Sequence, residues 1–127
     1  MSDADTDMAR SSRREGVCAV HSLDRVVFTV PDLGEAEAFY RAFGLDVRRQ
    51  GERLDLHTFG HPQCWASVFA GTPRKRLAYL RLGIFEADLP GFRERIRAAG
   101  LEAPPHPLGD GSGLWLRNPD GVPMQLC

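Results

Sequence analysis

The sequence has few cysteines, and those it has are far apart. Cys18, Cys64 and Cys127 are the three cysteines of the 127-residue chain, and no two of them form a C-x-x-C pair. A disulfide framework or a zinc knuckle needs paired or clustered cysteines, whereas isolated ones favour reduced thiols. The cysteine pattern therefore predicts neither kind of cross-link.

Long hydrophobic runs and an excess of one charge are also missing. No run approaches the roughly 18 apolar residues that span a bilayer, and the N-terminus lacks the apolar segment of a secretion signal. Sixteen basic residues nearly balance seventeen acidic ones, so no global field attracts nucleic acid or an anionic membrane. We expect a cytoplasmic protein with no nucleic-acid or membrane partner.

The length and composition fit one folded domain behind a polar leader. Residues 1–20 are polar and charged without a sustained apolar period, which predicts a flexible leader. The folded domain is expected at 21–127. In the whole chain, 43% hydrophobic and 26% charged residues are typical of a globular protein.

One pattern of strands and a helix occurs twice in the folded part. Each helix starts after an aspartate and ends at a glycine, Asp32 to Gly44 and Asp88 to Gly100, at an offset of 56 residues. The apolar stripe of the first helix is Leu33, Ala36, Phe39, Tyr40 and Phe43. The strand candidates are 23–30, 45–50, 53–58 and 64–70 in the first half, and 77–85, 101–104, 113–117 and 122–126 in the second.

This repetition predicts an α+β fold. Two βαβββ modules, about 21–74 and 75–127, should form a curved, cup-like mixed sheet with the helices on its outer face. The opposite face of the sheet is then left as a pocket. Because side chains alternate along a strand, residues between the helix-facing ones point into it. The residues expected to bind a ligand there are Arg25, Thr29, Trp65, Ser67, Tyr79, Arg81 and Gln125.

Three stretches of the sequence resemble the vicinal oxygen chelate superfamily of glyoxalases, extradiol dioxygenases and bleomycin resistance proteins. They are LDRVVFTVPDLGEAEAFYRAFGLDV, KRLAYLRLGIFEADLPGFRERIRAAGLE and GLWLRNPDGVPMQL, within 21–127. In catalytic members the resemblance implies a divalent metal held by a His on the first strand, a His on the fifth and a Glu on the last. The corresponding residues here are Arg25, Tyr79 and Gln125.

None of these three residues suits the usual metal site. Arg25 has no lone pair to donate and would repel a cation. A phenol such as that of Tyr79 binds metal only when ionised, which without perturbation occurs at about pH 10. The neutral amide of Gln125 is a poor replacement for an anionic ligand. We therefore expect no metal and no cofactor at these positions.

The predicted pocket nevertheless has polar groups for a ligand. Arg25 and Arg81 are counterparts at the 56-residue offset, and two guanidinium groups suit a carboxylate or phenolate. Alternatively, each arginine pairs with an internal acid such as Glu52 or Asp55, or reaches solvent. Trp65 either forms a stacking wall for an aromatic ligand or packs in the core.

Three functions remain open on this basis. The leading one is metal-free binding of a small aromatic or anionic molecule, of the sequestration or resistance type that bleomycin resistance proteins represent. A second is the non-catalytic half of a two-domain extradiol dioxygenase, because PRKRLAYLRLGIFEADLPGF resembles the first half of such enzymes. A third is a glyoxalase-like or dioxygenase-like enzyme with an unusual or partner-supplied metal site. The resemblance also implies a homodimer.

Overall fold

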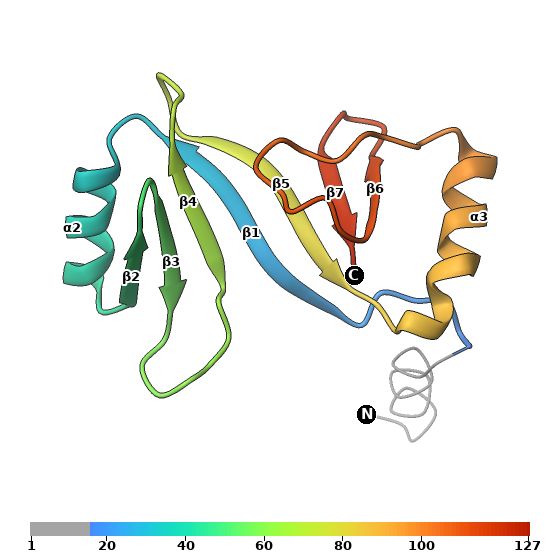
Figure 1. Cartoon of the computed structure of the whole chain (residues 1–127), viewed down its shortest axis with the longest axis horizontal. Coiled ribbons are helices and arrows are strands. Elements are labelled where there is room, and N and C mark those ends of the chain that lie inside the picture. The colour runs from blue at the N-terminus through green and yellow to red at the C-terminus, as the bar shows by residue number, and fades with distance from the viewer. Residues whose placement is uncertain (1–15) are drawn as a thin grey trace, which may run out of the picture. The chain divides into compact units, whose positions relative to one another are not determined.

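The computed structural model describes residues 16–127, so most of the leader expected at 1–20 lies outside the described residues. Figure 1 shows the strands and helices of the chain. Their bounds are β1 (Ser22–Val30), α2 (Leu33–Phe43), β2 (Asp46–Gln50), β3 (Arg53–His57), β4 (Ala66–Ala70), β5 (Arg76–Gly83), the 3-10 turn η1 (Glu86–Asp88), α3 (Leu89–Ala99), β6 (Leu114–Arg117) and β7 (Pro123–Leu126).

The strands form a mixed sheet in the order β2-β3-β4-β1-β5-β7-β6. β1 and β4 run parallel, whereas β2 with β3, β3 with β4, and β6 with β7 run antiparallel. The predicted α+β class is confirmed by this sheet and its two helices.

The chain divides into two compact units, which are described separately below. The central unit is Asp24–Leu80. The terminal unit is Arg81–Cys127 together with the described residues up to Leu23. The predicted repeat boundaries, 21–74 and 75–127, stay a prediction, because compactness does not test internal repetition.

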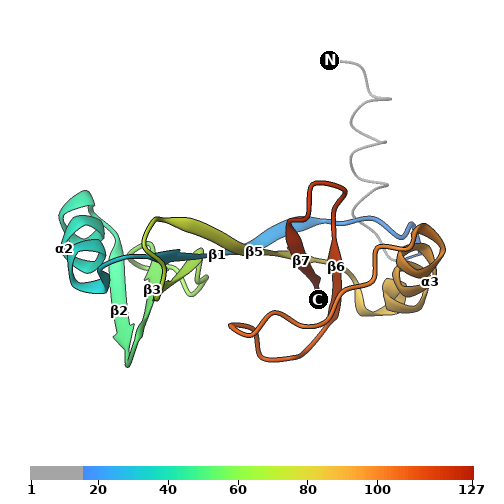
Figure 2. The ribbon, with the colours of Figure 1, turned by 90° about the horizontal axis from the view of Figure 1, so that it is seen from above.

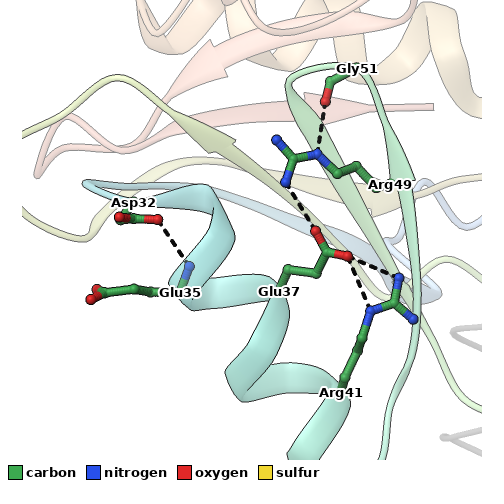
Figure 3. Close-up of polar contacts among 6 residues, drawn as sticks. All are labelled: Asp32, Glu35, Glu37, Arg41, Arg49 and Gly51. Carbon is green, nitrogen blue, oxygen red and sulfur yellow. Dashed lines mark hydrogen bonds and ion pairs between the residues drawn. The ribbon is translucent and has the colours of Figure 1, made fainter.

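Both helices end as the sequence predicts. Gly44 and Gly100 follow the last turns of α2 and α3 with φ of 107° and 68°, a left-handed conformation that glycine adopts without steric cost. The aspartate before α2 caps the helix, since Asp32 Oδ1 accepts a hydrogen bond from the Glu35 backbone N–H at 2.9 Å (Figure 3).

The core of the central unit lies between α2 and one face of the sheet. Phe28, Val68 and Leu54, from three adjacent strands, pack there with Leu33 of α2. Val26 and Val30 join the same cluster, so alternate residues of β1 face the helix. Alternation then leaves Val27 on the opposite face of the sheet.

The predicted apolar stripe of α2 is wrong at two positions. Phe39 and Phe43 are 60% and 73% exposed, whereas Leu33 is only 5% exposed. At about 100° per residue, Leu33, Ala36 and Tyr40 share an arc of about 60°, while Phe39 lies about 120° away from Leu33. Phe39 therefore lies outside the buried stripe, whereas Phe43 lies only about 80° from Leu33 but is the last residue of the helix.

Charged side chains connect α2 to β2 on the surface of the central unit. Glu37 accepts hydrogen bonds from Arg41 on its own helix and from Arg49 of β2, both at 3.0 Å (Figure 3). The bond from Arg49 is the largest cause of the lowered pKa of Glu37, followed by that from Arg41. These groups are exposed, so they add orientation rather than much stability.

In the terminal unit, β6 and β7 lie side by side in both views (Figures 1 and 2). Ile84, Ile96 and Leu126 form the buried core, with α3 contributing Ile96. The strand predicted at 101–104 is wrong. It is replaced by one isolated bridge between Glu102 and Leu116, because Pro104 and Pro105 have no N–H to continue the pairing.

Candidate functional site

The face of the central sheet opposite α2 contains a buried polar pair that links β3 to β4. Ser67, 2% exposed, donates a hydrogen bond from Oγ to Asp55 Oδ1 at 2.8 Å. Arg53 Nε lies 3.1 Å from the same carboxylate oxygen. The register places Val27 beside Ser67 and Ser67 beside Asp55, so these side chains share one face.

Two further side chains on this face each have a buried nitrogen atom without a hydrogen-bond partner in the described part of the chain. Arg25 precedes Val27 by two residues, and its Nε has no hydrogen-bond partner among residues 16–127. His57 follows Asp55 by two residues, and its Nδ1 is likewise unpaired within that range. Within residues 16–127, Asp55 pairs with Arg53 rather than with Arg25, and Glu52 forms no ion pair with Arg25. Buried unpaired polar atoms are uncommon and mark a place where a ligand or water can bind.

Thr29 and Trp65 have local roles in the central unit. The Thr29 hydroxyl donates to the Arg76 carbonyl at 3.3 Å and lies 2.8 Å from Thr72 Oγ1, which ties β1 to the turn before β5. Trp65 stands just before β4, is 45% exposed, and donates from Nε1 to Thr58 Oγ1 at 3.4 Å. Trp65 is therefore a partly exposed residue and does not pack in the core.

Tyr79 and Arg81 are two residues apart in β5, so their side chains lie on the same face of the strand. Tyr79 belongs to the central unit and Arg81 to the terminal unit. Tyr79 is 6% exposed. Arg81 donates from Nε to Cys127 Sγ at 2.9 Å, at the end of β7. The sequence did not predict this contact between the Arg81 guanidinium and the Cys127 thiol, because the two residues are far apart in the chain.

The structure explains why position 125 is an amide. Gln125 is 1% exposed, and its Nε2 donates to the Ser112 carbonyl oxygen at 2.9 Å. Trp115 Nε1 donates to the same oxygen at 3.0 Å. A carboxylate at position 125 has no proton to donate and would face this oxygen as a second acceptor. The Oε1 atom of Gln125 is buried and has no hydrogen-bond partner in the described part of the chain.

Asp110 holds the turn that presents Ser112 to Gln125. Its Oδ1 accepts from the Ser112 hydroxyl at 2.6 Å and from the Ser112 backbone N–H at 2.9 Å. These two bonds, and then the charge of Arg81, lower the pKa of Asp110 below its ordinary value. Nearby, burial and the charge of Arg117 lower the pKa of His106, whose Nδ1 accepts from the Leu108 N–H.

The arrangement does not fit the metal that the fold family implies at these positions. The Gln125 amide N–H is committed to Ser112, and Arg25 is a cation with a buried donor atom. Within residues 16–127 no three His, Cys, Asp or Glu side chains gather as a possible metal site.

The predicted site residues are divided between the two units. Arg25, Thr29, Trp65, Ser67 and Tyr79 belong to the central unit, whereas Arg81 and Gln125 belong to the terminal unit. The structure pairs β1 with β4 in the first group, and in the second it brings Arg81 to Cys127, two residues from Gln125.

The predicted ligand-binding set omitted four polar participants, Asp55, His57, Asp110 and Ser112, of which Asp55 had been considered only as an ion-pair partner for an arginine. Asp55 had a visible signal, since a charged residue between Leu54 and Leu56 in a strand points away from the core. The spacing of Asp110 and Ser112 is that of an Asx turn, in which the carboxylate accepts from the N–H two residues on.

Comparisons with known proteins identify the fold. No family model matches the chain. The solved structures it resembles include the Mn(II)-bound glyoxalase from Novosphingobium aromaticivorans, with 20% identity, a TM-score of 0.66, and coverage of 84% of this chain and 38% of that one. A halotolerant catechol dioxygenase has 17% identity, a TM-score of 0.70, and coverage of 86% and 39%. The chain therefore has the vicinal oxygen chelate fold, and the predicted resemblance is confirmed.

A curated relative narrows the comparison. The chain is 44% identical over 109 residues to Metapyrocatechase 2 of Cupriavidus necator, a match that covers 85% of this chain and 33% of the relative. The chain thus spans about a third of the length of that protein. In the described residues, no helix is long and apolar enough to cross a membrane.

Proposed function

We propose that the chain serves as the non-catalytic domain of an extradiol dioxygenase, in which another domain binds the metal. The observation that carries this proposal is the 44% identity to Metapyrocatechase 2, which extends over most of this chain but only a third of the relative. A domain of this kind needs no metal ligands of its own. The residues Arg25, Tyr79 and Gln125 at the ligand positions are then compatible with function.

Local contacts support this proposal. The Gln125 amide secures the turn at Ser112, and the Arg81 guanidinium contacts Cys127. Both side chains therefore contribute to the folding of the terminal unit. A metal-binding domain would need a lone-pair donor at the position of Gln125. We propose that the role of this domain is to fold stably and to support the catalytic domain.

The substrate class follows from the relatives rather than from this chain. The curated relative is a metapyrocatechase and one structural relative a catechol dioxygenase, so we propose a catechol-type aromatic for the complete enzyme. We also propose that a small-molecule ligand is bound by the seven residues predicted from the sequence, namely Arg25, Thr29, Trp65, Ser67, Tyr79, Arg81 and Gln125. The homodimer and the cytoplasmic location also stay predictions.

The comparisons favour this role over the free-standing, metal-free binding protein that was the leading expectation. Ring-cleaving dioxygenases recur among the relatives in sequence and in structure. We therefore give the sequestration function second place. It would need a ligand that binds the isolated chain tightly.

A chimera tests the proposal directly. The matched segment of Metapyrocatechase 2 is replaced by residues 21–127 of this chain, and ring cleavage of catechol and bound iron per chain are measured. We expect the chimera to keep iron and to cleave catechol. The isolated chain, incubated with iron(II) and freed of excess metal, should retain no iron and show no cleavage.

Two controls make the result decisive. The first is Metapyrocatechase 2 without the matched segment, which should lose activity or stability if that domain is needed. The second is circular dichroism of the chimera, which separates a misfolded product from an inactive one. Either catechol cleavage by the isolated chain, or a folded chimera that holds iron but is inactive, would overturn the proposal.

A further inference from the structure

The terminal unit contains a pocket, which we call the edge pocket, whose lining includes Trp115 but none of the seven predicted ligand-binding residues. It has a volume of about 290 Å³ and lies between α3, the segment that follows α3, and the start of β6. The residues that matter for its chemistry are Arg93, Ile96, Arg97, Glu102, Pro105 and Leu114. Its size is near the lower end for small-molecule sites, which begin at about 300 Å³.

Two prolines explain why the pocket is open. β6 is the last strand of the sheet, so its outer edge is not covered by another strand. The segment after α3 pairs with that edge as far as the bond from Ala103 N to Trp115 O. Pro104 and Pro105 then follow, and without N–H groups they cannot extend the pairing. The start of β6 is left facing α3 across a gap.

The charges around the edge pocket favour an anion. Arg93 and Arg97 are four residues apart on α3 and therefore project from the same side of the helix. Arg93 is exposed and makes no side-chain hydrogen bond or ion pair with residues 16–127. Arg97 lies 4.0 Å from Glu94 and 3.9 Å from Glu102, with all three side chains exposed, so these ion pairs are weak.

Two like charges at this spacing repel each other slightly, and a bound anion would relieve that repulsion. The lining between the charges is apolar, because Ile96, Pro105 and Leu114 contribute to it. A guanidinium group recognises a carboxylate through paired N–H groups. A ligand with one carboxylate and a compact apolar body satisfies both parts of the pocket.

We propose that the edge pocket binds a small carboxylate with a compact apolar body, held by Arg93 and Arg97. This inference is independent of the proposed function, since it involves none of the ligand-position residues. The site is formed by the terminal unit alone. It gives the chain a second place at which an organic anion can bind.

The probe is sodium benzoate, added to the ¹⁵N-labelled chain at constant ionic strength. We expect saturable shifts of the backbone amides of Ala103 and Leu114, with a dissociation constant on the order of a millimolar. The amide of Val68, in the core of the central unit, should not shift. Benzamide has the same ring without the charge and should bind at least about tenfold more weakly.

Three variants locate the binding. Arg93→Gln and Arg97→Gln should each weaken benzoate at least about tenfold, because each removes a charge-assisted hydrogen bond. Arg95→Gln is the matched control, since Arg95 is on the same helix but donates to the Cys18 carbonyl instead. Gln and Arg have similar helix propensities, so α3 should stay intact. Absent shifts with benzoate, equal binding of benzamide, or an equal loss in Arg95→Gln would overturn the proposal.

Discussion

At Gln125 the side chain has to donate a hydrogen bond, since its neighbour at 2.9 Å is the Ser112 carbonyl oxygen. Exchanging the amide for a carboxylate keeps the shape but removes the donor. We therefore predict that Gln125→Glu lowers the free energy of unfolding by about 3 kcal/mol at neutral pH, because a buried charge then faces another acceptor. Urea denaturation of the two proteins measures the difference.

The matched control for this change is Gln50→Glu. Gln50 is exposed at the end of β2, and its Oε1 accepts from Arg53 at 3.0 Å, so a carboxylate can replace it. We expect an effect within about 0.5 kcal/mol. If Gln125→Glu were as stable as the parent chain, the donor role of this amide would be refuted.

Asp110 gives a pH-dependent prediction at the same scale. The Ser112 hydroxyl, the Ser112 N–H and then the charge of Arg81 lower its pKa from 3.8. A lowered carboxyl pKa means that the stabilisation is present above the unfolded pKa and is lost as pH falls through the folded one. The turn should thus stay intact down to pH 3.8 and loosen only in stronger acid.

An NMR titration of the Asp110 carboxyl carbon and the Ser112 amide measures this pKa. Ser112→Ala removes the hydroxyl, the largest cause of the shift, and should move the pKa back toward 3.8. An unchanged titration in that variant would show that the Ser112 hydroxyl does not set the pKa.

Helix α2 presents two kinds of apolar residue to different surroundings. Leu33 is 5% exposed in the central core, whereas Phe43 is 73% exposed and stacks on Phe39 with ring centroids 6.0 Å apart. We predict that Leu33→Ala costs about 2–5 kcal/mol of unfolding free energy and Phe43→Ala less than about 1 kcal/mol. Thermal or urea unfolding of both variants tests this ranking.

Circular dichroism of each variant checks that α2 remains helical. A large loss in Phe43→Ala would mean that this ring is covered in solution, for example by a second copy of the chain. Dilution then separates the two cases, because the stability of an associated form depends on protein concentration.

Local signals explain why most elements were predictable. The ends of α2 and α3 depend on a few neighbouring residues, of which Gly44 and Gly100 are the clearest. The strand at 101–104 was not predictable from its apolar residues alone, because Pro104 removes the donor that pairing needs. Phe39 was misplaced because composition does not fix the width of a buried stripe, whereas Phe43 is the last residue of α2 and lies at the end of the stripe.

The candidate site was less predictable than the elements for a different reason. Alternation along β1 correctly separates Val26 and Phe28 from the residues on the other face. The partner of Gln125, however, is Ser112, thirteen residues away across a turn. Such contacts depend on how a loop folds back, and no periodicity in the sequence encodes them.

At the scale of the whole molecule, each unit has its own apolar cluster. Leu54 is fully buried in the cluster of the central unit, and Ile84 is 6% exposed in that of the terminal unit. The two clusters have no residue in common. We predict that Leu54→Ala, costing about 2–5 kcal/mol, and Ile84→Val, costing about 0.5–1.5 kcal/mol, act additively.

The double variant measures any coupling between the clusters. Urea unfolding is followed by circular dichroism for the parent, both single variants and the double variant, with the slope against urea compared in each. We expect the summed and measured losses to agree within about 0.5 kcal/mol. A coupling energy above about 1 kcal/mol would mean that the two clusters stabilise each other, and a second transition would mean that the units unfold separately.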